Sequence, residues 1–362
     1  MLRRTIILVG ALAALAALAT VAGAARAADF AGKTVEWIVP FKEGGGSGKW
    51  ARFYAPLLAK ALPGRPRIAI RHIPGAGSTR GANVFQARAK PDGLTILGTS
   101  GSTQFPYLLG DRRVRYEYKD WQVVLASPTG GVVYLNPALG VKTARDLVKL
   151  KGRTLLYGSQ GATSLDLIPL LAFEILGLDV KPVFGMRGRG AGRLAFERGE
   201  VGIDYQTTSA YLSQVVPLVK EGRAVPIMSW GALAKDGSIV RDPTVPKLPH
   251  FAEVYEQLHG RKPSGPAWKA WRTFFVAGFP GQKMVFLPKG TPPDIVAAYR
   301  AAFAKVVSAP GFAKMAARRL GAYEQHTGRE AEATKRLATT IAADDRRWVR
   351  EWLIRRFKVR LR

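Results

Sequence analysis

Apolar and polar residues alternate along this chain in short blocks that predict strands and helices in turn. Val35–Pro40 is an apolar run typical of a strand, and Ala51–Leu62 has apolar residues at helical spacing. Further strand-like runs are Arg67–His72, Leu94–Gly98, Trp121–Ser127, Gly131–Asn136, Thr154–Tyr157, Val201–Tyr205 and Val225–Trp230. This alternation predicts an α/β protein with open sheets.

Seven stretches have the pattern of helices, and one polar stretch is expected to be a loop. Thr143 and Asp146 form a capping-box variant at the start of the first helical stretch. The helical stretches are Thr143–Leu150, Leu167–Leu176, Gly190–Arg198, Ser209–Lys220, Pro292–Val307, Phe312–Leu320 and a single long helix over Glu330–Phe357. Thr99–Gln104, at the end of a strand, is predicted to be a polar loop.

Three glycine-rich loops follow predicted strands. They are Gly44–Gly48, Pro74–Gly77 and the Gly/Ser/Thr loop Gly158–Ser164. The first turn of a helix leaves N–H groups without partners, and glycine lets a ligand approach them closely. A strand, a glycine loop and a helix start therefore predict a backbone site for a small anion.

The strand–glycine loop–helix unit occurs in both halves of the chain, which predicts two lobes. We expect crossings between them at Ser127–Val132 and at Val225–Trp230, where a hinge would allow closure. Residues 28–128 and 229–362 would form lobe 1, and residues 129–228 would form lobe 2. One glycine-rich loop from each lobe could then face the other across a cleft.

The N-terminal residues predict export. Arg3 and Arg4 precede an apolar run, and Ala25-Arg26-Ala27 matches a signal-peptidase site, so residues 1–27 are expected to be removed by cleavage after Ala27. A retained membrane anchor is the alternative. The sequence contains no cysteine, which excludes disulfides, thiolate metal sites and a lipid-modified N-terminal cysteine. The mature protein is therefore expected in the periplasm.

The chain is strongly basic. Removal of three arginines with the signal peptide lowers the formal charge from +29 to +26. The basic residues are spread along the chain, so we expect a solvated surface that steers anions, and no nucleic-acid binding.

Motifs for catalysis and cofactors do not match. Gly44–Trp50 lacks the first glycine and the hydroxyl residue that a nucleotide P-loop requires. There is no G-x-S-x-G elbow, and the four histidines lack metal-site spacing. We therefore expect a binding protein without a cofactor or metal, and not an enzyme.

Three basic or aromatic regions have two interpretations each. Of the four arginines between residues 187 and 198, Arg187 lies in a glycine turn and is the candidate for binding a carboxylate; the others are expected on a solvated helix edge. The basic C-terminal stretch 346–362 would pack its aromatic residues on the first lobe, or else contact a membrane or an acidic partner. Residues 262–286 are expected to be surface packing, or a rim of the cleft.

Taken together, the motifs resemble those of the substrate-binding proteins of tripartite tricarboxylate transporters, the Bug family. The resemblance covers nearly the whole mature chain. It rests on Ile38–Phe41 with Gly44–Ser47, Pro74–Gly77, Lys90–Leu97, Tyr157–Gly161 with Thr163-Ser164, Met186–Gly188, Pro246–Pro249 with Glu253, and Leu287–Pro292. It departs from the usual family pattern at Lys42-Glu43, Ser47-Gly48, Met186 and Gln206-Thr207.

The resemblance implies a two-lobed periplasmic-binding-protein fold, with two open sheets joined by crossing strands and a carboxylate bound between the lobes. The ligand would be a mono- or dicarboxylate, with an aromatic acid among the candidates, and the partners would be the permease subunits of a membrane transporter. A monomer is expected. The ligand-binding residues expected from the motifs are Phe41, Gly46, Ser47, Gly48, Ala76, Gly77, Ser100, Ser159, Gly161, Thr163, Ser164, Arg187 and Gln206.

Two other functions are compatible with the same scaffold. The chain could present its liganded form to a membrane receptor for sensing, or it could be an exported enzyme if the cleft contained a nucleophile or base.

Overall fold

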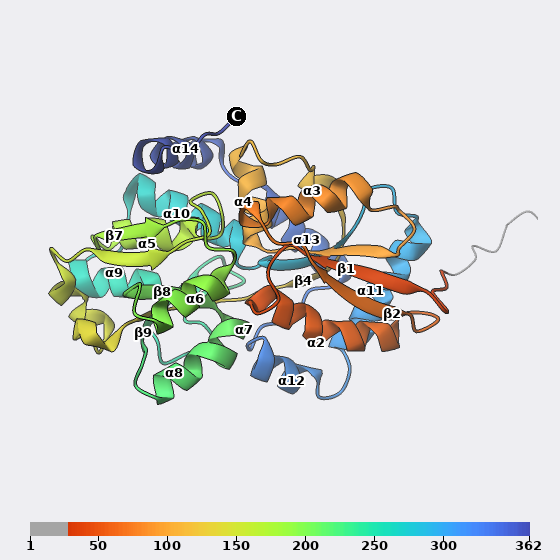
Figure 1. Cartoon of the computed structure of the whole chain (residues 1–362), viewed down its shortest axis with the longest axis horizontal. Coiled ribbons are helices and arrows are strands. Elements are labelled where there is room, and N and C mark those ends of the chain that lie inside the picture. Colours follow the sequence, from red (N-terminus) through yellow and green to blue (C-terminus); the bar gives the residue numbers. More distant parts are fainter. Residues whose placement is uncertain (1–27) are drawn as a thin grey trace, which may run out of the picture.

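The computed structural model describes residues 28–362, which form two α/β halves lying side by side, each built on a five-stranded sheet (Figure 1). The first sheet has the order β2-β1-β3-β12-β4. Its strands are β1 (Thr34–Val39), β2 (Arg67–His72), β3 (Thr95–Gly98), β4 (Gln122–Ser127) and β12 (Lys283–Leu287). β1 is parallel to β2 and β3, whereas β12 is antiparallel to β3 and β4. The predicted signal peptide lies outside the described residues.

The second sheet has the order β7-β6-β8-β5-β9. Its strands are β5 (Gly131–Leu135), β6 (Leu155–Gly158), β7 (Val180–Val183), β8 (Ile203–Thr207) and β9 (Val225–Ser229). β5 is antiparallel to β8 and β9, and β6 is parallel to β7. A small antiparallel hairpin follows, formed by β10 (Ala232–Leu233) and β11 (Ile239–Val240). The prediction of an α/β fold with two open sheets joined by crossing strands is confirmed, and the structure shows that both sheets are mixed.

Helices cover both sheets. Those associated with the first sheet are α2 (Gly46–Ala61), α3 (Thr79–Arg88), α4 (Gly101–Leu109), α11 (Pro293–Val307), α12 (Phe312–Arg319) and α13 (Gly328–Thr339). The others are α5 (Leu167–Ile175), α6 (Arg189–Glu197), α7 (Thr208–Ala210), α8 (Val216–Lys220), α9 (Phe251–His259), α10 (Gly265–Gly278) and α14 (Ala343–Phe357). Ala144–Leu150 forms a 3₁₀ helix whose capping box joins Thr143 and Asp146, as expected.

The chain passes between the sheets at two places. The first crossing is the short link from β4 to β5, within the expected range Ser127–Val132. After β9 the chain forms α9 and α10, whose Phe251, Trp271 and Phe275 join the apolar core of the second sheet. It re-enters the first sheet at β12, after α10 has packed against helices of both lobes.

Aromatic residues of α10 lie in the protein core. Trp271, Phe274 and Phe275 are fully buried, and Phe274 packs edge-to-face on Phe105 of α4 at 5.1 Å between ring centroids. The expectation that residues 262–286 form surface packing is therefore wrong for these three side chains. Their burial joins α10 to both lobes.

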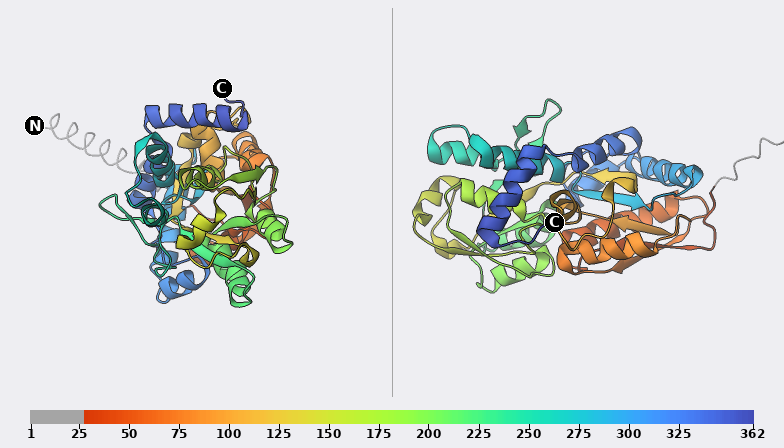
Figure 2. Two further views of the ribbon diagram at one scale, coloured as in Figure 1. Left: turned by 90° about the vertical axis from the view of Figure 1, so that its left-hand side faces the viewer. Right: turned by 90° about the horizontal axis from the view of Figure 1, so that it is seen from above.

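The predicted long C-terminal helix is interrupted by an extended link after Thr339. Thr340 and Ala342 both have extended backbone angles, which end α13 and precede α14. The prediction of one helix over Glu330–Phe357 is wrong because the two segments pack on different surfaces. α13 contacts β4 of the first sheet, whereas α14 lies on α10, with its end beside α4 (Figures 1 and 2).

Within residues 28–362 the structure contains no helix whose length and hydrophobicity would allow it to span a bilayer.

Candidate ligand-binding site

A cavity of about 280 Å³ lies where the two lobes meet. Its walls come from the loop before α2, the start of α4, the turn before α6, the loop after β6 and the strand β12. The residues lining it include Phe41, Gly46, Ser47, Ser100, Ser102, Gln160, Arg187, Arg189, Arg193, Gln282 and Lys283. Their positions in both lobes make the cavity the natural place for a ligand that stabilises closure.

The loop before α2 is held tightly against the second lobe. A Cβ atom at Gly46 would lie 2.7 Å from Thr207 Oγ1 and 3.1 Å from Ser209 Oγ. A Cβ atom at Gly48 would lie 2.2 Å from the carbonyl oxygen of Glu43 in the loop itself. Glycine at these two positions therefore lets the turn close and lets the lobes approach each other.

Three helices begin at the cavity. α2 starts at Gly46, α4 follows the N-cap Ser100, and α6 follows the N-cap Gly188, whose φ of 130° favours glycine. Each helix start contributes N–H groups and the positive end of a helix dipole, worth about 0.3–1 kcal/mol for an exposed anion. Three such ends around one space favour a bound anion.

Charged side chains add to this field. The lining includes Lys42, Arg187, Arg189, Arg193 and Lys283, and among the described residues that line the cavity none is acidic. No cluster of His, Asp or Glu side chains within residues 28–362 is arranged to hold a metal ion. The site is thus electrostatically suited to a negatively charged ligand.

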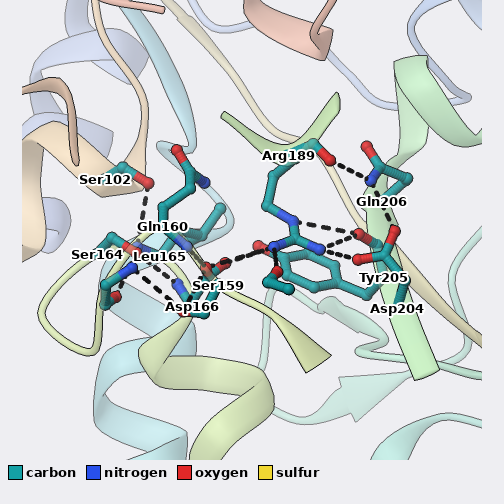
Figure 3. A network of polar contacts seen from close by, with 12 residues as sticks. Ser102, Ser159, Gln160, Ser164, Leu165, Asp166, Arg189, Asp204, Tyr205 and Gln206 are labelled. Carbon is teal, nitrogen blue, oxygen red and sulfur yellow. Dashed lines mark hydrogen bonds and ion pairs between the residues drawn. The ribbon is translucent and has the colours of Figure 1, made fainter. Parts of the chain in front are cut away.

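Arg189 is buried between two aspartates, Asp166 and Asp204, and beside the ring of Tyr205 (Figure 3). Its guanidinium lies 3.4 Å from Asp166 Oδ2 and also pairs with Asp204. The central carbon is 5.0 Å from the Tyr157 ring centroid and 4.6 Å from that of Tyr205. The expectation of a solvated helix edge is therefore wrong for Arg189, because the side chain turns inward to satisfy two buried carboxylates.

The same network fixes the loop after β6 (Figure 3). Asp166 accepts hydrogen bonds from Ser159 Oγ at 2.9 Å and from the N–H of Gln160 at 2.6 Å. Burial raises the pKa of Asp204, although Arg189 and the Tyr134 hydroxyl, which donates at 2.5 Å, oppose that rise. The network therefore supports the cavity wall from behind.

Lys283 approaches the cavity from the first sheet. It begins β12, is only 3% exposed, and places Nζ 3.4 Å from Ser47 Oγ. Burial lowers the pKa of its ammonium to about 7. An amine in this state can switch between charged and neutral forms near physiological pH.

The structure brings five of the predicted binding residues to the cavity. These are Phe41, Gly46, Ser47, Ser100 and Arg187. Ser100 also caps α4, because its Oγ accepts the N–H of Ser102 at 3.2 Å. Eight predicted residues are not part of the lining: Gly48, Ala76, Gly77, Ser159, Gly161, Thr163, Ser164 and Gln206.

The second glycine turn faces a different part of lobe 2. A Cβ atom at Gly77 would lie 4.0 Å from Ser164 Cβ and 3.9 Å from Arg113 Nη1. Thr163 Oγ1 donates to Asp111 Oδ2 at 2.7 Å and accepts from Arg113 Nη2 at 2.9 Å. The turns 74–77 and 161–164 therefore meet through protein side chains rather than across the cavity.

The remaining predicted residues have partners within the protein. Ser159 Oγ donates to Asp166 and accepts the N–H of Gly161 at 3.2 Å. Gln206 Nε2 donates to the Arg189 carbonyl oxygen and to Asp204 Oδ2, both at 2.9 Å. These contacts give both residues a role in shaping the wall.

Sequence reasoning did not identify Gln282 and Lys283. The available signal was a lysine at the start of the apolar run Lys283–Leu287, because a buried strand rarely contains an unpaired charge. That signal becomes specific only when Lys283 is seen to lie beside Ser47 in the first turn of α2.

No known family profile matches the sequence, and no curated relative matches it. Solved structures match over nearly the whole chain. The periplasmic binding protein BugD aligns with a TM-score of 0.64 and 18% identity, over 89% of this chain and 97% of that one. MatC from Rhodopseudomonas palustris, solved with bound malate, aligns with a TM-score of 0.61 and 23% identity, over 84% of this chain and 96% of that one.

A further Rhodopseudomonas palustris protein, solved with adipate, gives a TM-score of 0.66 and 20% identity over 90% and 98% of the two chains. The first of these neighbours is a periplasmic binding protein by name, and this chain shares the fold of all three. The structural resemblance expected from the motifs is confirmed.

Proposed function

We propose that this chain is a periplasmic solute-binding protein that holds an organic carboxylate between its lobes and delivers it to a tripartite tricarboxylate-type permease. One observation carries the proposal: three helix starts and five basic side chains border an inter-lobe cavity whose lining has no acid among the described residues. Charge-assisted hydrogen bonds are strong where water is excluded, so a carboxylate is well matched to this space.

The size of the cavity supports a small ligand. At about 280 Å³ it is at the lower end of the range of small-molecule sites. Phe41, Leu165 and Leu194 add apolar surface between the polar groups, which suits the hydrocarbon part of an organic acid. Two similar structures were solved with malate and adipate, which are acids of this class.

A thermal-shift screen tests the proposal. The panel contains malate, adipate, hexanoate, benzoate and terephthalate, with choline as a cationic control. A bound acid adds RT ln(1 + [L]/Kd) to the free energy of unfolding, so at least one acid is expected to raise the unfolding temperature. Choline is expected to leave that temperature unchanged. Failure of every acid would contradict the proposal.

A variant pair locates the site. Ser47→Leu places a bulky side chain beside Lys283 in the cavity and should abolish the shift. Ser308→Leu, at the exposed end of α11, should leave it unchanged. Delivery is tested separately, by ligand uptake into vesicles that contain the permease. Catalytic turnover of the bound acid would favour an enzyme instead.

A further inference from the structure

Lys283 differs from the other deeply buried cation of the cavity. Arg189 is compensated by Asp166 and Asp204. Among residues 28–362, by contrast, no acidic side chain forms an ion pair with Lys283, and burial alone accounts for its lowered pKa. The only side-chain hydrogen-bond partner of its Nζ in this part of the chain is Ser47 Oγ, at 3.4 Å.

An uncompensated ammonium in a protein interior is unfavourable, and buried charges are usually paired. An anion placed beside it would supply the missing charge, and the interaction would be strengthened by the low dielectric of the site. The ligand cavity is the open space that Lys283 borders.

Gln282 provides a second unsatisfied group at the same wall. Its side chain is 2% exposed and lines the cavity, and its Oε1 has no hydrogen-bond partner in the described part of the chain. Whichever way the amide is oriented, one of its polar atoms lacks a partner. A cation without a counter-charge and an amide oxygen without a partner, on one wall, indicate a place for a polar ligand group.

We propose that Lys283 is the specificity-determining residue of the site, and that its ammonium pairs directly with the inner carboxylate of the ligand. Ser47 Oγ and the first N–H groups of α2 complete the cradle, and the Gln282 amide contacts the adjoining polar atom. This inference rests on the proposed function, which it deepens by naming the group that recognises the acid.

The surrounding charges are compatible with a proton-linked interaction. The loop and turn at the mouth contribute Lys42 and Arg187, and α6 contributes Arg189 and Arg193. Asp166 and Asp204 lie behind Arg189 and are engaged by it. On α2 the neutral phenol of Tyr54 is occupied by Gln325 at 2.8 Å. The lining contains no histidine, so Lys283 is its titrating group near neutral pH.

Calorimetry at pH 6, 7, 8 and 9 tests the inference, using whichever acid of the panel binds the wild type most tightly. If only the ammonium form binds, affinity should fall about tenfold per pH unit above pH 7. At pH 8, two buffers of different ionisation enthalpy should report uptake of about one proton per acid bound. Lys283→Met should lose at least about 100-fold in affinity at pH 6 and should show little pH dependence.

Two further variants keep the result interpretable. Lys283→Arg retains a charge that does not titrate in this range, so any remaining binding should be independent of pH. Lys289→Met changes an exposed lysine near the end of the same strand and should behave as wild type.

The outcomes separate the two proposals. If the wild type binds an acid but Lys283→Met binds it equally well, or with the same pH profile, the inference about Lys283 is overturned and the proposed function stands. If the wild type binds no acid at any pH, the proposed function itself is overturned, and this inference with it.

Discussion

Ser209 Oγ donates a hydrogen bond to the carbonyl oxygen of Gly46 at 3.4 Å, which joins the second lobe to the first turn of α2. This contact lies beside the cavity, and it depends on the absence of a side chain at Gly46. A substitution there therefore probes the approach of the two lobes without altering a charged group.

Gly46→Ala should weaken ligand binding. The added Cβ would lie 2.7 Å from Thr207 Oγ1, which is too close for packed atoms, so the Thr207 side chain or the loop must shift. We expect at least a tenfold loss of affinity, because a 1.4 kcal/mol loss of inter-lobe contact is already tenfold. Small-angle scattering should show less compaction with ligand than in the wild type.

Gly202→Ala, which lies outside the cavity lining, is the control for this prediction. A Cβ atom at that position would make ordinary van der Waals contacts, at 3.5 Å to Leu139 Cδ1 and 3.7 Å to Leu155 Cδ2, so affinity should change little. Equal affinities for the two variants would show that the observed approach of Gly46 to Thr207 is not needed for binding.

Replacement of Arg189 should destabilise the second lobe. Arg189→Leu leaves Asp166 and Asp204 buried without their cation, and removal of one partner from a buried ion pair typically costs about 3–5 kcal/mol. Urea unfolding at pH 7 should show this loss. Arg198→Leu breaks an exposed pair with Glu200 and should leave the unfolding midpoint unchanged. An unchanged free energy of unfolding for Arg189→Leu would argue that the network does not support the cavity wall.

The C-terminal helix should contribute stability through packing on the second lobe. Trp352 is 3% exposed, and its Nε1 donates to Glu174 Oε1 of α5 at 2.7 Å. Trp352→Ala should lower the free energy of unfolding by about 3–5 kcal/mol, as for other large core truncations. Ile354→Ala, at a side chain that is 47% exposed, should have a small effect. If Trp352→Ala and Ile354→Ala both lowered the free energy of unfolding only slightly, the helix would be loosely attached and available to a membrane or partner.

Local sequence features predicted much of the fold because they are set by neighbouring residues. The glycines of 44–48 follow an apolar strand and precede a helical repeat, and the structure has β1, a turn and α2 in that order. The capping pair Thr143 and Asp146 was similarly readable. These signals depend on a few adjacent positions and need no knowledge of the tertiary structure.

The meeting of distant elements was not predictable in the same way. The sequence shows three glycine-rich loops but not which of them face each other, and the structure pairs 74–77 with 161–164 away from the cavity. Ser47 and Lys283 are 236 residues apart. β12 is inserted between β3 and β4, and this topology brings the lysine beside the first turn of α2.

Arg189 illustrates the same limit for electrostatics. Its spacing with Arg193 suggests one exposed helix face, yet Arg189 is buried and Arg193 pairs with Glu197. The difference arises because the aspartates that hold Arg189 come from β8 and from the segment before α5. Charge pairing across strands cannot be read from helical spacing.

The burial of Lys283 predicts an unusual dependence of stability on pH. In the unfolded chain its pKa is near 10.5, and in the folded, ligand-free protein it is about 7. Between these pH values the unfolded chain binds more protons, so this group makes the free energy of unfolding rise with pH. Below pH 7 both states are protonated, and the unfavourable burial of the ammonium is fully expressed.

Lys283→Met should therefore stabilise the ligand-free protein while impairing its binding. The gain in unfolding free energy should be about 5 kcal/mol at pH 6 and about 2 kcal/mol at pH 9, because each unit of pKa shift corresponds to about 1.4 kcal/mol. Urea unfolding of wild type and variant at pH 6, 7.5 and 9 measures the difference, and Lys289→Met should show no such trend. A gain that is constant with pH would indicate improved packing alone, and a loss of stability at pH 6 would show that the ammonium is already compensated in the free protein.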